Sequence, residues 1–117
     1  MSNIETLTQE TLTDALGQPG ILVIDFWAPW CGPCRAMAPQ FERAAQLRPD
    51  YRFAKDEQPT VASAFQIRSV PTLVVINDGD VIGAYPGVVG AEQLVGALDQ
   101  LASTPAPETV LQQGAAR

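Results

Sequence analysis

Positions 21–27 of the chain read ILVIDFW, an almost continuous apolar run that only Asp25 interrupts. Runs of this kind are typical of a strand that is covered on both faces of a sheet. Over positions 34–47 apolar side chains recur at intervals of three or four residues, which is the spacing of an amphipathic helix. The pattern therefore predicts a buried strand that leads into a helix.

The remaining segments change between strand and helix patterns in the same way. The predicted elements are, in chain order, a strand at 3–7, a helix at 9–16, the strand at 21–27, the helix at 34–47, a strand at 51–55, a short helix at 56–67, strands at 72–76 and 81–85, and a helix at 91–101. Thr8 is the expected N-cap of the first helix. NDGD at 77–80 is expected to form a hairpin turn, because Asn, Asp and Gly accept positive φ angles. This order indicates an α/β fold with a strand–helix–strand unit.

Composition narrows the class of protein. A chain of 117 residues, 46% hydrophobic and 17% charged, has the size and balance of one globular domain. The spacing of apolar residues loses its periodicity from Ser103 onward, so we expect a domain at 1–102 and a flexible tail at 103–117.

The formal net charge of −6 argues against binding to nucleic acid. The first eight residues lack a secretory signal, and no segment approaches the roughly 18 apolar residues of a membrane span, so we expect a cytoplasmic protein.

The two cysteines of the chain both lie in WCGPC, at the junction of the predicted strand and helix. In a reducing compartment a close pair of this kind favours a reactive role over a structural one. Only a thiolate attacks a disulfide, and the N-terminus of the helix would stabilise that anion on Cys31. Cys34, one turn inside, is expected to be more shielded and to resolve the mixed disulfide. Gly32 permits close approach of a target, and Pro33 suits the first helical turn.

Two other interpretations of the cysteines remain open at this point. A closed zinc site needs four ligands, whereas the chain offers two Cys and no His, so a metal would require a dimer. Two inert buried cysteines are also possible, although their proximity and the flanking Trp30 argue against this. We expect no metal site.

Asp25 and Pro71 are the other unusual residues. An ionised carboxyl in an apolar strand is costly to bury unless it is paired or protonated, and the alternative is an Asp at an exposed strand end. Pro71 stands at the entry to a predicted strand, where its residue type alone favours a trans peptide bond.

Five segments taken together resemble the thioredoxin family: DFWAPWCGPCRAMAP, FAK, IRSVPTL, NDGDV and PGVVGAEQL, in the order of the family and over about residues 4–101. The resemblance implies the thioredoxin fold, a mixed central sheet flanked by helices. It implies that Asp25 lies behind the cysteine pair and assists proton transfer with Cys34, with Lys55 as its basic neighbour. It also implies a kink at Pro39.

The same resemblance implies a substrate surface around Cys31. Pro71 would form a cis peptide bond facing the cysteines, against the preference of its residue type, and the Val70 backbone would pair with an extended substrate segment. The residues of the expected apolar rim are Trp27, Trp30, Val70, Gly87 and Val88.

By resemblance, the protein would be a monomeric reductant of protein disulfides that keeps cytosolic proteins reduced and binds no cofactor. Its Cys31–Cys34 disulfide would be reduced by NADPH through a flavin-dependent thioredoxin reductase. A disulfide oxidase or isomerase is the alternative enzyme. Gly-Pro between the cysteines, with no His to stabilise the thiolate further, favours a reductase over these two. The rival from another class is a non-catalytic binding subunit of a larger assembly, which would use the same rim.

One departure from the family pattern is the link between Lys55 and Pro59, which holds only DEQ, about three residues fewer than is usual. The shortening could shorten the strand, shift Lys55 relative to Asp25 or trim a loop beside the cysteines. Reduced stability is an expected consequence.

Overall fold

The computed structural model describes residues 4–57 and 59–103. Its elements are β1 (Ile4–Thr6), α1 (Gln9–Leu16), β2 (Ile21–Phe26), α2 (Gly32–Leu47), β3 (Arg52–Asp56), α3 (Pro59–Ala64), β4 (Thr72–Asn77), β5 (Asp80–Pro86) and α4 (Ala91–Ala102). The strands form one five-stranded sheet in the order β1-β3-β2-β4-β5. Strands β1 and β2 run parallel to β3, whereas β4 is antiparallel to β2 and β5. The mixed sheet predicted by resemblance is confirmed.

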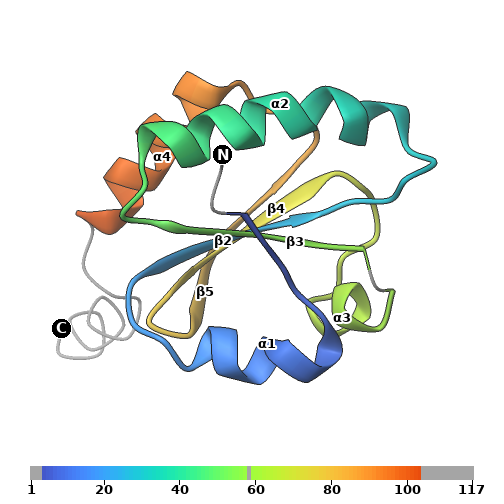
Figure 1. Cartoon of the computed structure of the whole chain (residues 1–117), viewed down its shortest axis with the longest axis horizontal. Coiled ribbons are helices and arrows are strands. Elements are labelled where there is room, and N and C mark those ends of the chain that lie inside the picture. Colours follow the sequence, from blue (N-terminus) through green and yellow to red (C-terminus); the bar gives the residue numbers. More distant parts are fainter. Residues whose placement is uncertain (1–3, 58, 104–117) are drawn as a thin grey trace, which may run out of the picture.

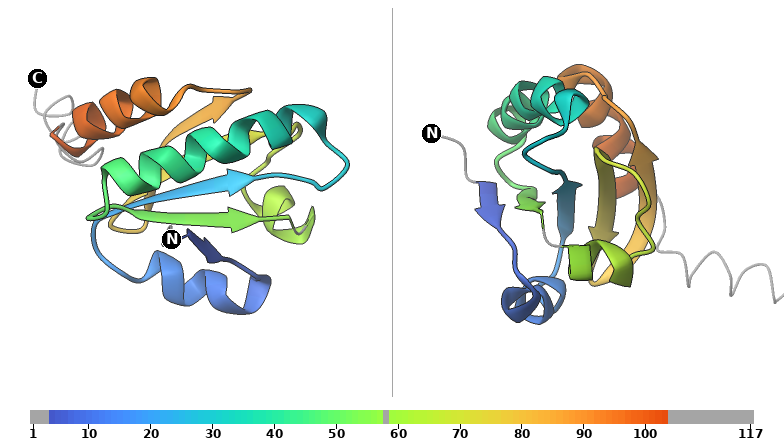
Figure 2. Two further views of the ribbon diagram at one scale, coloured as in Figure 1. Left: turned by 45° about the horizontal axis from the view of Figure 1, so that its top comes forward. Right: turned by 90° about the vertical axis from the view of Figure 1, so that its right-hand side faces the viewer.

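Helices cover both faces of this sheet. Helices α2 and α4 lie on one face and α1 and α3 on the other (Figures 1 and 2). The central strand β2 is buried along its whole length. Ile21 and Val23 pack in the core beneath α2 and α4, whereas Leu22 and Ile24 pack in the core on the side of α1 and α3. The strand covered on both faces is therefore confirmed.

Most elements begin and end within about two residues of their predicted positions. The Thr8 hydroxyl accepts a hydrogen bond from the Thr11 amide at 3.3 Å, as expected of an N-cap. The hairpin turn is confirmed by φ angles of 53° at Asp78 and 88° at Gly79. The predicted tail, apart from its first residue, lies outside the described residues.

The short helix predicted within 56–67, with Pro59 in its first turn, does begin at Pro59, but α3 covers only Pro59–Ala64. At its start, Asp56 belongs to β3 instead and pairs with Phe26 of β2. At its end, Gln66 has a φ angle of 60°, which a right-handed helix does not allow.

The short link after β3 leaves the sheet intact. Lys55 pairs with Asp25 and Asp56 with Phe26, so β3 is paired up to the last residue of β2 and Lys55 keeps its place beside Asp25. Only Glu57 and Gln58 then remain before α3 begins at Pro59. The shortening therefore falls in the loop and not in the strand. The expected loss of stability stays a prediction.

Helix α2 is held against α4 and the sheet at both ends. At its C-terminal end, Arg48 forms an ion pair with Asp99 of α4 at 2.6 Å, and the Tyr51 hydroxyl donates to the same carboxylate at 2.8 Å. Toward its N-terminal end, the Met37 sulfur accepts a hydrogen bond from the Val89 amide at 3.3 Å. Of these contacts, the one to Met37 lies in the half of the helix that carries the cysteines. Pro39 lies inside α2, and its kink stays a prediction.

The core beneath α2 gives the first testable prediction. Phe41 is fully buried and its ring meets that of Phe53 edge-on, with centroids 5.4 Å apart. We expect Phe41→Ala to lower the free energy of unfolding by about 3 to 5 kcal/mol, measured by urea denaturation. Leu47→Ala in the same helix is the matched control, because Leu47 is 38% exposed and should cost much less. Equal losses in both variants would contradict this account of the core.

Candidate functional site

The cysteines lie where β2 ends and α2 begins. Helix α2 starts at Gly32, two residues earlier than predicted, because Cys31 is its N-cap: the Cys31 backbone is extended and its sulfur accepts a hydrogen bond from the Cys34 amide at 3.1 Å. Pro33 stands in the first turn, where its missing N–H removes no helical hydrogen bond. The sequence thus places one sulfur against the unpaired N–H groups of a helix end.

Cys31 and Cys34 form a disulfide, with Cα atoms 5.2 Å apart. Their side chains are almost equally buried, with exposed fractions of 4% and 3%, so the expected difference in shielding is wrong for the oxidised pair. The difference between them lies in their neighbours. The Cys31 sulfur is 3.6 Å from the carbonyl oxygen of Val70, whereas Cys34 lines a small, partly open cavity.

That cavity, of about 70 Å³, connects Cys34 to an acid–base pair. It is lined by Asp25, Trp27, Cys34, Arg35, Ala38 and Lys55. Asp25 and Lys55 reach it from neighbouring positions on β2 and β3. The Lys55 ammonium also lies 5.7 Å from the centre of the Trp27 ring, within reach of a cation–π interaction. The predicted grouping of Asp25, Lys55 and Cys34 is present in the structure.

The carboxyl of Asp25 is only 2% exposed, and its Oδ1 atom has no hydrogen-bond partner among the described residues. Burial raises the pKa of this carboxyl from 3.8 to about 6, although the nearby Lys55 ammonium opposes the rise. A buried acid with a pKa near neutrality can both accept and donate a proton at the pH of a cell. The alternative of an exposed strand-end Asp is wrong.

The loop before β4 forms the other side of the cysteine pair. The peptide bond between Val70 and Pro71 is cis, as the resemblance implied. The Gly87 amide donates to the Pro71 carbonyl at 2.8 Å, and the Thr72 hydroxyl donates to the Ser69 carbonyl at 2.8 Å. These bonds hold the loop so that the Val70 carbonyl faces Cys31.

Some of the predicted rim residues pack against the cysteines, and others are exposed to solvent. Trp27 and Val70 pack against the cysteines. Trp30 is 78% exposed and Val88 is 50% exposed, and Val88 directly follows Gly87. Gly32 and Pro33 are also exposed beside the disulfide. The structure therefore shows apolar side chains open to solvent near the paired cysteines.

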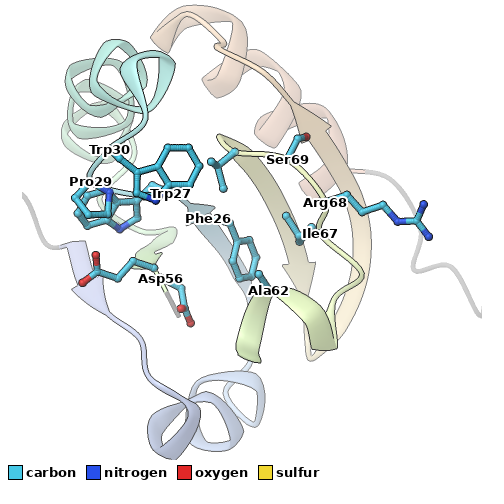
Figure 3. Close-up of a pocket in the computed structure, with 12 residues that line it drawn as sticks. Phe26, Trp27, Pro29, Trp30, Asp56, Ala62, Ile67, Arg68 and Ser69 are labelled. Carbon is cyan, nitrogen blue, oxygen red and sulfur yellow. The ribbon is translucent and has the colours of Figure 1, made fainter. Parts of the chain in front are cut away.

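A second and larger pocket, of about 360 Å³, was missed by sequence reasoning (Figure 3). Its lining residues are Phe26, Trp27, Ala28, Pro29, Trp30, Asp56, Glu57, Ala62, Ile67, Arg68, Ser69 and Val70. They come from separate parts of the chain, so no local pattern marks them. Arg35 and Ala38 of the small pocket were also missed, although Ala38 follows Cys34 by four residues, a helical spacing that could have indicated it.

The described residues contain no group of three or more His, Cys, Asp or Glu side chains that could hold a metal ion. Over the same part of the chain, no helix has the length and apolar character needed to cross a membrane.

Comparisons with known proteins agree with the geometry. Residues 3–100 match the family model described as Thioredoxin. The chain is 36% identical over 103 residues to "Putative thioredoxin 2" of Streptomyces coelicolor, covering 86% of this chain and 77% of that protein. It is 39% identical over 99 residues to "Thioredoxin 1" of Synechococcus elongatus, covering 81% and 89%. The solved structure of oxidised mitochondrial thioredoxin 3 of Saccharomyces cerevisiae is similar, with a TM-score of 0.76, 34% identity and coverage of 83% and 94%.

The buried Asp25 gives a prediction about stability and pH. The folded protein holds the proton of this carboxyl more tightly than the unfolded chain does, because its pKa rises from 3.8 to about 6 on folding. Its ionisation therefore opposes folding, and stability is lost as the pH rises through this interval. In Asp25→Asn this loss is absent. We expect the free energy of unfolding of the variant, relative to the natural chain, to increase by about 2 kcal/mol between about pH 4 and about pH 8.

Urea denaturation at the two pH values measures this difference, with both proteins in the disulfide form. A relative stability that does not change with pH would show that Asp25 is not a buried acid.

Proposed function

The chain belongs to the thioredoxin family, and we propose that it is a general reductant of protein disulfides in the cytoplasm. Its chemistry is dithiol–disulfide exchange through the Cys31–Cys34 pair, and it is a thiol–disulfide oxidoreductase. The observation that supports the proposal most is the position of Cys31, which caps α2 and faces the Val70 carbonyl. A thiolate at this position gains stabilisation from the helix end and lies beside a backbone that can bind an extended substrate.

In the proposed reaction, the Cys31 thiolate attacks one sulfur of the target disulfide. A bond forms between Cys31 and the target, and the second target sulfur leaves as a thiolate that takes up a proton. Cys34, once deprotonated, attacks the Cys31 sulfur, forms the Cys31–Cys34 disulfide and releases the first target sulfur. Two electrons pass from the protein to the target, which leaves as a dithiol.

We propose that Asp25 accepts the proton that the Cys34 thiol loses before it attacks Cys31. The cavity between them is large enough for ordered water, and its carboxyl and ammonium groups supply polar partners. With a pKa of about 6, the Asp25 carboxyl is mostly ionised at neutral pH and can accept the Cys34 proton. Lys55 opposes the rise in that pKa and so keeps the base available.

The substrate surface in this proposal comprises Trp27, Trp30, Val70, Pro71, Gly87 and Val88. The exposure of Trp30 and Val88 supports it, as does the packing of Trp27 and Val70 against the cysteines. A Cβ atom at Gly32 would have no neighbour within 4 Å, so a target chain can approach the cysteines on this side.

The partners follow from the chemistry. A dithiol that acts repeatedly needs a reductant, and we propose a flavin-dependent thioredoxin reductase supplied with NADPH. Both cysteines form one reactive pair, and the reducing cytoplasm is the compartment that keeps such a pair reduced, which supports a cytoplasmic location.

We propose a monomer whose catalytic domain spans residues 1–102, with 103–117 as a tail. The match of the family model to residues 3–100 supports these bounds. The rival role as a non-catalytic binding subunit is not favoured by any of these observations.

The roles of the two cysteines are separable by mutation. We expect Cys31→Ser to abolish insulin reduction with reductase and NADPH, because the attacking thiol is lost. Cys34→Ser should instead accumulate mixed disulfides, visible on non-reducing gels, because attack proceeds and resolution does not. The variant with both cysteines replaced is the control and should form no mixed disulfide. Trapping by Cys31→Ser would reverse the assignment, and full biological function of the double variant would favour the binding subunit.

The role of Asp25 predicts a slower second step in Asp25→Asn. The rate at which the mixed disulfide resolves should fall on the order of 100-fold near neutral pH, because the base is lost. The difference should narrow above about pH 8.5, where the Cys34 thiol ionises without assistance. Stopped-flow measurement of substrate release gives this rate.

The matched control is attack by Cys31 in the Cys34→Ser background, with and without Asp25→Asn, where the two rates should agree. An equal loss in this first step would show that Asp25 acts on Cys31 instead.

A further inference from the structure

The loop between β5 and α4 carries two residues of the proposed substrate surface, Gly87 and Val88. At the start of the loop, the Gly87 amide donates a hydrogen bond to the Pro71 carbonyl at 2.8 Å. Pro71 follows Val70, whose carbonyl oxygen lies 3.6 Å from the Cys31 sulfur. Because Val88 is 50% exposed, its position depends mainly on how the backbone of this loop is held.

Two side chains of α2 hold the other end of the loop. The Met37 sulfur accepts a hydrogen bond from the Val89 amide at 3.3 Å. The Gln40 Oε1 atom accepts a hydrogen bond from the Ala91 amide at 2.8 Å. Met37 and Gln40 are separated by three positions of α2 and therefore share one face of it, on the side where α4 lies (Figure 2). We call these two hydrogen bonds the clamp.

The start of α4 explains why an acceptor from another helix is needed. The first amide groups of a helix have no partner within that helix. The N-cap of α4 is Gly90, which has no side chain that could accept a hydrogen bond from them. Gln40 supplies the acceptor for the Ala91 amide instead. The end of the loop is thus tied to the helix that begins beside the cysteines.

The burial of Met37 gives its contact a similar weight. Its side chain is fully buried and follows Cys34 by three residues in α2. A thioether sulfur is a weak acceptor, but an amide that leaves it inside the protein loses a partner and gains free energy only if water replaces it. The clamp therefore favours the position of the loop in which the Val89 amide faces the sulfur.

We propose that Met37 and Gln40 are positioning residues for substrate binding, which act by holding the loop between β5 and α4 so that Val88 keeps its place near the cysteine pair. The inference rests on the proposed function as a disulfide reductase. A target that binds a loop already in place loses less conformational entropy than a target that must order the loop. The clamp then favours protein targets, which contact the loop, and does not affect small disulfides that reach only Cys31.

The test compares insulin with hydroxyethyl disulfide, of which only insulin is large enough to contact the loop. The chemically reduced protein is mixed with each disulfide in a stopped-flow instrument, which gives the second-order rate constant of the first exchange. The double variant Met37→Leu with Gln40→Leu removes both acceptors and keeps side chains of similar size. We expect its rate constant with insulin to fall on the order of tenfold and its rate constant with hydroxyethyl disulfide to stay unchanged.

Two single variants are the controls. Gln40→Glu keeps an oxygen acceptor for the Ala91 amide and should retain the natural rate constant with insulin. Arg43→Leu removes the ion pair of Arg43 with Glu92, at 3.1 Å, which also joins α2 to α4 but holds no residue of the loop. It should leave both rate constants unchanged, because the clamp remains.

Amide hydrogen exchange tests the clamp directly. The Val89 and Ala91 amides should exchange faster in the double variant than in the natural chain by about tenfold or more, because each loses its acceptor. Thermal unfolding shows whether the double variant is folded. If it is not, Gln40→Leu alone carries the test, since Gln40 is only partly buried. It should speed exchange at Ala91 and slow the reaction with insulin.

The two proposals fail in different ways. Unchanged exchange at these amides, or an unchanged rate constant with insulin in the folded variant, would overturn the positioning role and leave the reductase intact. An equal loss with hydroxyethyl disulfide would also overturn it, because the substitutions would then act on the cysteines themselves. Failure of the natural chain to reduce insulin would instead reject the proposed function, and this inference with it.

Discussion

The burial of β2 on both faces is the constraint on which the rest of the structure depends. Side chains alternate along a strand, so each residue of β2 must enter one of the two cores. Ile21 and Val23 enter the core beneath α2, and Asp25 follows them by the same alternation. Its carboxyl is therefore held in an apolar layer behind Cys34 and cannot be hydrated as a surface acid is. The raised pKa and the pairing with Lys55 across the sheet follow from this one placement.

The end of β2 also determines where Cys31 lies. The chain leaves β2 at Phe26 and must turn before it can pack α2 against the sheet, and this turn places Cys31 at the helix N-cap. A cap is usually a short oxygen-bearing side chain, because an acceptor is needed for the free N–H groups. Here a sulfur accepts the hydrogen bond from the Cys34 amide. The group that completes the helix is also the group that reacts, which links local folding to chemistry.

Much of this could be predicted from the sequence, because it depends on local patterns. The apolar run over β2 and the spacing in α2 indicate their elements directly, and Thr8 and the turn at Asp78 and Gly79 have the residue types that their backbone angles require. The bounds of α3 could not be predicted, because Asp56 is drawn into β3 by pairing with Phe26, a contact between distant residues. The cis bond at Pro71 required the family resemblance, since the residue type alone favours trans. The large pocket had no signal in the sequence because its surfaces come from separate segments.

The paired register of β2 and β3 has a consequence for how such a chain can diverge. One residue inserted within β3 would turn Lys55 to the opposite face of the sheet and away from Asp25, since successive strand residues face opposite sides. One residue inserted after Asp56 would change only the length of the link. Insertions and deletions after Asp56 thus leave the pairing of Asp25 with Lys55 in place. The length of this link can therefore vary between lineages without changing the register that sets the buried acid beside its basic neighbour.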